Sequence, residues 1–599
     1  MKQKIKMLLQ GFFVAVALTS KFHMPLQASA YETKLDYIIA SIYELLGEYN
    51  FQFILVWILG TVFFYFMRDK VVRKKNTSIL LVGFFSLCLL FGRSYYETDS
   101  SAYVLGSVVN FVKSVFVFAG YFCLIYVLLA LIFDFFKNTS FIDEKSHFFS
   151  EKAFLKSIII LSVVYGIVIL ISYPGTLCWD VIGQIEQVTK GTGYSTHHPL
   201  FHTLLVGGLT SLGQTVFGSY EVGLFLYMLL QMAMFVLALS FTISTLAKRG
   251  LKAGYLVALL VLYCVTPLYT NIVSVAIKDV PYCAFVIGYV VLFAQLLETP
   301  DKIKNKKFLC GFVLLQIGVI LSRNNGLPLV LLSGLLAFIY LYKKYNLKEK
   351  IVYLLSGFVL SIGTAKLVLF VLMQVTNATE GSSAEMLSIP FQQTARYLQL
   401  YQNEIDLEEK EAIEAVLGDV SIVAAKYNPE ISDDVKALFV KEATTKDILN
   451  YMGAWAKGFF KHPGVYFEAF FIHVYGWFTP VATNAIRYET TYTEIAQQGL
   501  FPGAQKGLIF LYRFANKIPV LGLLENIGAY VWGMFLFIFY AKKNKEKGMV
   551  FATLPLVISL LVCMASPCFI SHPRYGMPII CTLPFLYGFM LSKTKEEAV

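Results

Sequence analysis

The chain has 599 residues, of which 57% are hydrophobic and only 15% are charged. Soluble proteins usually carry about 25% charged residues, and a water-soluble fold of this length could not hide so much apolar surface. The composition therefore predicts an integral membrane protein and excludes extensive disorder. We interpret the formal net charge of +11 as a signal of membrane orientation, and we expect no nucleic-acid partner.

The N-terminal 30 residues combine a basic start, an apolar run and an Ala-Ser-Ala stretch. This pattern fits a cleaved signal peptide and equally fits an uncleaved first helix; both leave the next segment outside the membrane. The following apolar run, near 52–67, ends in a cluster of arginines and lysines. Because positive residues mark the cytoplasmic side, this helix runs from outside to inside.

Further runs of roughly 20 apolar residues predict the remaining spans. They lie near 78–93, 112–135, 155–173, 221–246, 253–272, 281–297, 308–322, 327–344, 350–374, 525–541, 549–567 and 575–591. Lysine clusters between these runs fall on the cytoplasmic side in turn. We therefore predict an all-α polytopic membrane protein with about 13 or 14 transmembrane helices, the lower number applying if the first is cleaved.

Two regions do not fit simple spans. Residues 200–217 are apolar but rich in glycine, and a span there would place the basic residues Lys248, Arg249 and Lys252 outside. We therefore expect an interfacial or re-entrant segment. Residues 376–524 are more polar, with helical spacing over 403–447, and predict a small extracytoplasmic helical subdomain.

The predicted organisation has five parts. They are a signal-like segment or first helix (1–30), N-terminal transmembrane helices (31–150), a transmembrane core with external loops (151–375), the extracytoplasmic segment (376–524), and C-terminal helices with a cytoplasmic tail (525–599).

Side chains suited to chemistry gather in loops predicted to lie on the extracytoplasmic face. They are Asp180, His197, His198, Lys278, Asp279, Arg323, Gln393, Arg396, Arg574 and Tyr575. Taken singly, each has a structural alternative: Asp180 can cap a helix, Lys278 can snorkel, and Arg323 can cap helix carbonyls. Taken together, they predict a surface site where cations bind a lipid phosphate and a carboxylate activates a hydroxyl.

A divalent metal stays open as a cofactor. His198 and His202 are spaced to share a helix face, which suits two metal ligands, and Asp180 is a candidate third. No HExxH motif accompanies them, and no Cys/His spacing indicates structural zinc. No metal ligand is therefore assigned with certainty.

The layout resembles the GT-C superfamily of membrane glycosyltransferases over roughly residues 155 to 591. The resemblance rests on Tyr173-Pro-Gly followed by Asp180, on His197-His198-Pro199-Leu200 opening a short apolar segment, and on Arg574-Tyr575-x-x-Pro578. The second motif is similar to the Pro-Pro-Leu segment of lipid-A aminoarabinose transferases and protein mannosyltransferases. With its Gln-Gln-x-Ala-Arg signature, the chain looks closest to an uncharacterised bacterial branch.

The resemblance implies transfer of a hexosyl or pentosyl group from a polyprenyl-phosphate donor, with inversion. The acceptor would be a cell-envelope glycan, lipid or protein on the extracytoplasmic face of the cell membrane. Asp180 matches the first-loop acid and would be the general base; Lys278, Arg323 and Arg574 would bind phosphate. The chain departs from the common Asp-Glu doublet, because Val181 follows Asp180.

Two other functions remain alternatives. A transporter or flippase of lipid-linked sugars would place ionisable residues near the bilayer midplane, whereas here such residues lie mostly at external helix ends. A non-enzymatic envelope assembly component would use 376–524 for binding, but it does not explain acids and cations in separate loops.

Overall fold

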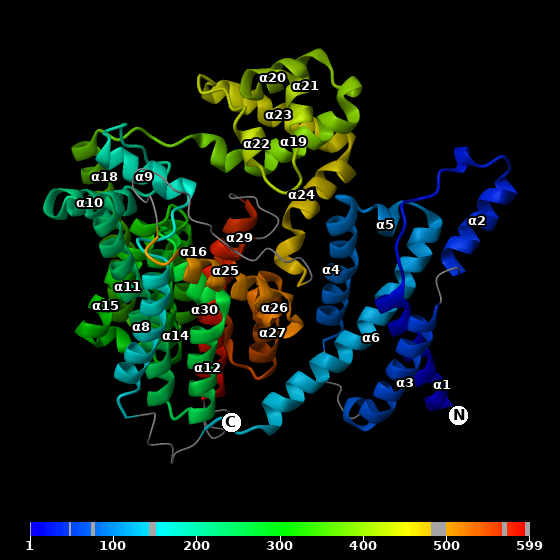
Figure 1. Ribbon diagram of the computed structural model, residues 1–599, viewed down its shortest axis with the longest axis horizontal. Coiled ribbons are helices and arrows are strands. Elements are labelled where there is room, and N and C mark those ends of the chain that lie inside the picture. Colours follow the sequence, from blue (N-terminus) through cyan, green and yellow to red (C-terminus); the bar gives the residue numbers. More distant parts are fainter. Residues whose placement is uncertain are drawn as a thin grey trace. The chain divides into compact units, whose positions relative to one another are not determined.

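The computed structural model describes residues 2–46, 50–72, 78–142, 151–480, 499–565 and 572–592. Within these ranges the regular structure is helical, apart from three isolated β-bridges, so the predicted all-α class is confirmed (Figure 1). The chain divides into two compact units. Unit 1 combines 1–140 with 386–482, and unit 2 combines 141–385 with 483–567 and 572–599. The segment 376–524 therefore contributes to both units.

Unit 1 begins with helices of the N-terminal part and continues with a group of shorter helices. They are α1 (Lys2–Thr19), α2 (Lys34–Leu46), α3 (Phe51–Val72), α4 (Ile79–Thr98), α5 (Ala102–Leu105), α6 (Val108–Asn138), α19 (Ser388–Tyr401), α20 (Leu407–Leu417), α21 (Val420–Ala425), α22 (Asp433–Lys436), α23 (Thr445–Lys461) and α24 (Pro463–Phe478).

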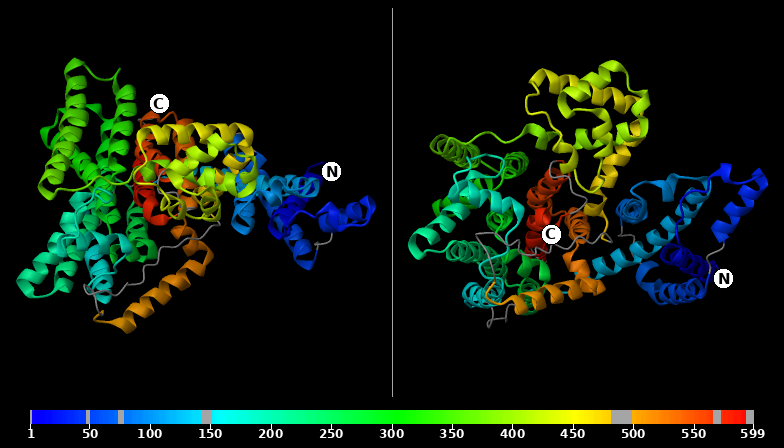
Figure 2. Two further views of the ribbon diagram at one scale, coloured as in Figure 1. Left: turned by 90° about the horizontal axis from the view of Figure 1, so that it is seen from above. Right: turned by 45° about the horizontal axis from the view of Figure 1, so that its top comes forward.

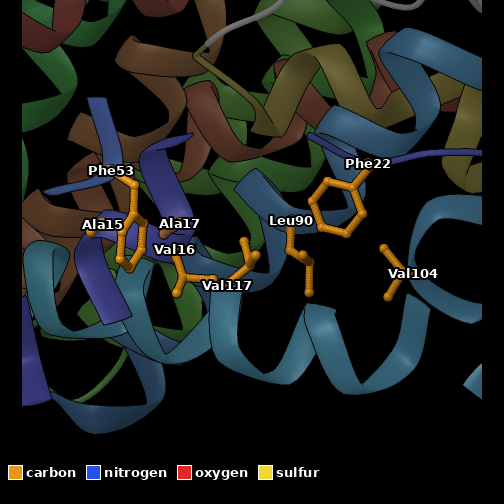
Figure 3. Close-up of a cluster of buried hydrophobic side chains, with 8 residues drawn as sticks. All are labelled: Ala15, Val16, Ala17, Phe22, Phe53, Leu90, Val104 and Val117. Atoms are coloured by element: carbon orange, nitrogen blue, oxygen red, sulfur yellow. The ribbon is translucent and has the colours of Figure 1, made fainter. Parts of the chain in front are cut away.

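The N-terminal helices of unit 1 pack around a buried apolar cluster (Figure 3). It contains Ala15, Val16, Ala17, Phe22, Phe53, Leu90, Val104 and Val117. Helices α1 and α3 approach closely at Gly11, where an added Cβ would lie 2.3 Å from Oγ1 and 2.7 Å from the backbone nitrogen of Thr61. A small residue is needed there because it lets the two helix backbones approach.

The later helices of unit 1 form the helical subdomain that the spacing over 403–447 predicts. Capping boxes begin two of them: Asp406 with Glu409 at α20, and Thr444 with Asp447 at α23. In each box the two side chains satisfy backbone N–H groups that the first helical turn leaves without partners. Polar ends of this kind suit helices in water. Which side of a membrane they face remains a prediction.

Unit 2 holds the other helices. They are α8 (Ala153–Ile171), α9 (Trp179–Thr189), α10 (Leu200–Phe217), α11 (Tyr220–Lys248), α12 (Ala253–Val265), α13 (Pro267–Val273), α14 (Asp279–Glu298), α15 (Lys306–Ser322), α16 (Gly326–Leu341), α17 (Leu347–Leu354), α18 (Ser361–Thr376), α25 (Pro502–Lys517), α26 (Pro519–Glu525), α27 (Ile527–Lys543), α28 (Lys547–Ala552), α29 (Leu554–Ala565) and α30 (Pro573–Leu591).

The chain is a multi-pass membrane protein by the length and apolarity of its helices. Among the described residues, eight helical stretches can cross a membrane, or up to ten if each of two bent pairs counts as one span. This is fewer than the roughly 14 spans expected from apolar runs. Other predicted spans are helical but shorter, for example Phe51–Met67 and Gly326–Leu341.

Helix α10 is apolar and 18 residues long, yet it does not follow the direction of the neighbouring spans. Figure 1 shows it lying across the direction of α8, α11 and α14, and a further view is given in Figure 2. A Cβ at Gly213 of α10 would lie 2.2 Å from the backbone nitrogen of Gly223 in α11. These two glycines let α10 turn back tightly onto α11. Because α10 is also among the eight stretches long enough to cross a membrane, its interfacial orientation stays a prediction.

Candidate active site

The predicted acid Asp180 lies in the first turn of α9. This helix begins at Trp179, and its N-cap residue, Cys178, makes no side-chain capping bond. Asp180 is therefore not a capping residue; its carboxylate accepts hydrogen bonds from the side chains of Lys278 and Arg574. A negative side chain in the first turn of a helix is also favoured by the helix dipole.

The loop before Lys278 is held by a glutamine from the middle of a span. The amide nitrogen of Gln231 in α11 donates to the carbonyls of Val273 (3.1 Å) and Val275 (2.7 Å). Backbone bonds from Thr176 to Ser274 and from Ala276 to Thr176 join this loop to the segment before α9. The loops that carry Asp180 and Lys278 are thus fixed to each other.

A second buried network positions α9 against α10 and α11. Gln184 donates through its amide nitrogen to Thr203 Oγ1 at 2.9 Å and accepts from His202 Nδ1 at 3.1 Å. The other ring nitrogen of His202, Nε2, accepts from the Tyr227 hydroxyl at 2.7 Å. All these donors and acceptors are matched by one neutral histidine tautomer, so the network fixes the orientation of α9.

Five charged side chains from four separate parts of unit 2 meet at the amino end of α14. We call them the acid–cation cluster: Asp180, Lys278, Asp279, Arg323 and Arg574. Lys278 Nζ lies 3.1 Å from Asp180 Oδ2, and Arg574 donates to Asp180 Oδ2 at 2.5 Å and to Asp279 Oδ2 at 2.7 Å. Arg574 therefore bridges the two carboxylates.

The second arginine of the cluster approaches Asp279 from the other side. Arg323 pairs with Asp279 Oδ1 at 2.8 Å, although the geometry is that of an ion pair without a well-aligned hydrogen bond. Its guanidinium lies 4.8 Å from the ring centroid of Tyr575 and 5.7 Å from that of Tyr282. Such rings stabilise a cation where water is excluded.

Exposure separates the two acids. The side chain of Asp180 is 33% exposed, whereas that of Asp279 is 1% exposed, and those of Lys278, Arg323 and Arg574 range from 8% to 10%. Three cations face two carboxylates, so the cluster has an excess of one positive charge. Because that charge lies in a largely dry site, it favours an anionic ligand.

The cluster keeps its acid ionised. Burial by itself would raise the pKa of the Asp180 carboxyl, but the charges of Lys278 and Arg574 outweigh burial and hold this pKa well below its usual range. Burial lowers the pKa of Lys278, and the neighbouring Asp180 works against that effect. Nearby opposite charges favour the charged form of each group.

The histidine pair lies beside Lys278. Lys278 Nζ donates to His198 Nδ1 at 2.9 Å, and the rings of His197 and His198 are 4.6 Å apart. Burial, followed by the charge of Lys278, lowers the pKa of His198 to about 3. Because an ammonium group only donates, the neutral ring carries its proton on Nε2, which makes that atom a donor.

The three residues considered as metal ligands do not form one group. Asp180 and His198 both contact Lys278, while both ring nitrogens of His202 are occupied by Gln184 and Tyr227. Within the described ranges, no three His, Cys, Asp or Glu side chains gather in a way that could hold a metal ion.

Gln393 and Arg396, which the sequence also suggested as substrate contacts, belong to α19 of unit 1 and are not part of the acid–cation cluster. Gln393 donates to the Tyr466 carbonyl and accepts from Trp455 Nε1, both at 3.0 Å. Arg396 pairs with Glu468 at 3.4 Å. Both side chains thus have partners within their own unit.

Several positioning residues escaped the sequence analysis. Gln231, Thr203 and Tyr227 lie within apolar segments, and no sequence motif singles them out. An amide within a span is costly unless it is hydrogen-bonded, so Gln231 carried a usable signal. Nothing in a single sequence indicates that its partners are two carbonyls about 40 residues further along the chain.

Of three comparisons with known proteins, one assigns the chain to a family. A solved structure of the S. cerevisiae protein O-mannosyltransferase Pmt1-Pmt2 complex, bound to the sugar donor, matches with 15% identity and a TM-score of 0.32. The match covers 44% of this chain and 38% of that chain. No curated protein sequence matches. The sequence profile of the family of unknown function DUF6020 matches residues 189–599, more than half of the chain, and the protein therefore belongs to this family.

Proposed function

We propose that this protein is a membrane glycosyltransferase that moves a sugar from a polyprenyl-phosphate donor to an acceptor in the cell envelope. The observation that carries the proposal is the acid–cation cluster, in which a partly exposed carboxylate contacts two buried cations and three cations in all face two carboxylates. The cations suit a phosphate, and the carboxylate suits an acceptor hydroxyl.

The reaction follows from these two roles. Asp180 takes the proton from the acceptor hydroxyl, whose oxygen attacks the anomeric carbon of the donor sugar. The bond between that carbon and the phosphate oxygen breaks, and its electron pair leaves on polyprenyl phosphate. Lys278 and Arg574 stabilise the developing negative charge, so the leaving group needs no dedicated acid. A single displacement inverts the anomeric centre.

The other members of the cluster have supporting roles. Asp279 is a positioning residue, because its buried carboxylate contacts Arg323 at one oxygen and Arg574 at the other. Tyr575 packs against both guanidinium groups. His198 supplies an Nε2 donor to the phosphate or sugar, and the exposed ring of His197 provides a face for the sugar.

The site lies at helix ends rather than inside spans, which favours surface chemistry over transport. Asp180 lies in the first turn of α9 and Lys278 directly precedes α14. Arg323 lies between α15 and α16, and Arg574 lies in the first turn of α30. The charge alternation of the flanking loops supports an extracytoplasmic site in the cell membrane. Gln393 and Arg396 remain proposed substrate contacts only on the basis of the sequence signature.

The test is a transfer assay in native membranes with a panel of polyprenyl-phosphate sugars, comparing wild type with Asp180→Asn. We expect the variant to lose about 10²- to 10⁴-fold in turnover, the usual contribution of a general base. Glu186→Gln is the matched control, since Glu186 lies on the same helix but pairs with the exposed Lys190. Equal turnover by Asp180→Asn and wild type would contradict the assignment of the base.

A further inference from the structure

The oxygen proposed to take a proton is already bonded to both cations proposed to bind phosphate. Asp180 Oδ2 accepts from Lys278 Nζ at 3.1 Å and from Arg574 at 2.5 Å. A carboxylate and a phosphate use the same charge-assisted hydrogen bonds. Asp180 and a bound phosphate therefore compete for the same donors.

The competition can be resolved without leaving an arginine unpaired. Arg574 contacts Asp180 through one terminal nitrogen and Asp279 through Nε at 2.7 Å. If the first contact is exchanged for a ligand oxygen, the second still gives the guanidinium a carboxylate partner. Asp279 is 1% exposed and Asp180 is 33% exposed, so an arriving anion reaches Asp180 and its partners before it reaches Asp279.

We propose that Asp180 is a built-in counter-ion that holds the place of the donor phosphate and is displaced from Lys278 and Arg574 when the donor binds. This inference rests on the proposed function. It gives the reaction an order: the donor binds first, and its phosphate frees the carboxylate that then accepts the proton of the acceptor. Without a bound donor, the Asp180 carboxylate stays paired with Lys278 and Arg574.

The surroundings of Asp180 agree with this order. Charged and titratable groups that act on it, or on which it acts, are Lys278, Arg574, His198, His572, Tyr575 and Cys178. When the donor phosphate replaces Asp180 on Lys278 and Arg574, the carboxylate loses two cationic contacts and gains a negatively charged neighbour. Both changes favour the protonated form of a carboxyl group, so its pKa moves upward and it becomes a stronger base.

The test is a binding measurement that does not depend on knowing the sugar. Full-length protein in nanodiscs of phosphatidylcholine is titrated at low salt with polyprenyl monophosphate, the product of the proposed reaction. We expect Asp180→Asn to bind about tenfold more tightly than wild type, because the competing anion is gone, while turnover is lost. Asp180→Glu keeps the charge and should stay within about threefold of wild type.

Two controls separate charge from general disturbance. Glu186→Gln removes one negative charge from α9 away from the cluster and should leave affinity within about twofold of wild type. Uncharged polyprenol should not distinguish Asp180→Asn from wild type. Size-exclusion chromatography checks the fold of each variant, and Asp180→Ser, with the same expected tightening, serves if Asp180→Asn does not fold.

The outcomes are distinct. Tighter binding of polyprenyl monophosphate by Asp180→Asn supports the counter-ion. Equal or weaker binding, with wild type still binding, overturns the counter-ion and leaves the proposed donor class in place. No binding by wild type or by either neutral variant overturns both the counter-ion and the proposed donor.

Discussion

Helix α14 carries an ion-pair site at each end, and the two sites differ in how their charged groups are paired. At its amino end lies the acid–cation cluster, with three cations against two carboxylates. At its carboxyl end, Glu298 binds Arg249 through two bonds of 2.7 and 2.8 Å. We call the second site the Arg249–Glu298 clamp.

Every guanidinium nitrogen of Arg249 in the clamp donates to a partner, and Lys302 adds a second positive charge near the pair. Arg249 also donates Nε to the Ser592 hydroxyl at 2.7 Å, and its guanidinium lies 4.0 Å from the ring centroid of Phe589. Helix α30 takes part in both sites, since Arg574 lies in its first turn and Ser592 directly follows it. The comparison indicates that the clamp fastens the helices, whereas in the cluster two cations are paired with the partly exposed Asp180, whose place an anion can take.

Removing the buried acid of the cluster should have the largest effect on stability. Asp279→Ala leaves the Arg323 and Arg574 guanidinium groups buried without this counter-charge, and we expect a loss of about 3–5 kcal/mol. Denaturant unfolding of the purified protein in detergent measures it. Asp301→Ala, which removes an exposed partner of Lys304, is the control and should leave the free energy of unfolding unchanged within error. A loss below about 1 kcal/mol at Asp279 would argue against its positioning role.

Replacing an arginine with lysine, at Arg574 or at Arg249, tests which of the two sites binds the ligand and which only holds helices together. A lysine cannot reproduce the fork by which Arg574 contacts two carboxylates, so Arg574→Lys should weaken polyprenyl monophosphate binding about tenfold. Arg249→Lys disturbs an equally forked contact at the clamp but should leave this affinity within about twofold. Titration of both variants in nanodiscs provides the measurement, and similar losses of affinity in both would remove the distinction between the sites.

Neutralising the acid of the clamp should have a modest effect. The side chains of Arg249 and Glu298 are 22% and 18% exposed, so solvent screens part of their attraction. We expect Glu298→Gln to lower the free energy of unfolding by about 1 kcal/mol and to leave phosphate affinity unchanged. Unfolding and binding measured on the same preparation test both statements. Loss of binding would mean that the two ends of α14 are coupled.

The smallest expected effect is on the pH dependence of stability. The pKa of His198 is about 3 in the folded protein against an ordinary value of 6.5, and the pKa of His572, lowered by burial and by Arg574, is about 4. The unfolded chain therefore binds protons first as pH falls, so stability is lost below about pH 6.5.

The low folded pKa of Asp180 means that its contribution stays constant down to about pH 4. Between about pH 6.5 and pH 4, His198→Gln should reduce the slope of the free energy of unfolding against pH. We expect a reduction of less than about 1 kcal/mol per pH unit, because the ring is only half-buried. Thermal unfolding at a series of pH values measures this slope. An unchanged slope in this variant would contradict the neutral state of His198.

Much of the fold was readable because the signals are local. The apolar runs predicted spans such as 155–173 and 221–246, which appear as α8 and α11. The charge argument at Lys248, Arg249 and Lys252 set 200–217 apart from the spans, and α10 does lie across its neighbours, although its place in the interface stays a prediction. Helical spacing likewise predicted the subdomain in unit 1. A run's length and its flanking charges are properties of neighbouring residues, which the sequence contains in full.

What the sequence by itself determined is the membrane class, the helical architecture and the identity of the charged residues at the helix ends. It could not determine their partners, because Asp180 meets Lys278 across 98 positions and Arg574 across 394. Only the tertiary structure separated the acids into one buried and one partly exposed carboxylate, and assigned Gln393 and Arg396 to another unit. The burial of a charged side chain and the counter-charge beside it both depend on packing between distant segments. Neither can therefore be predicted from neighbouring residues in the sequence.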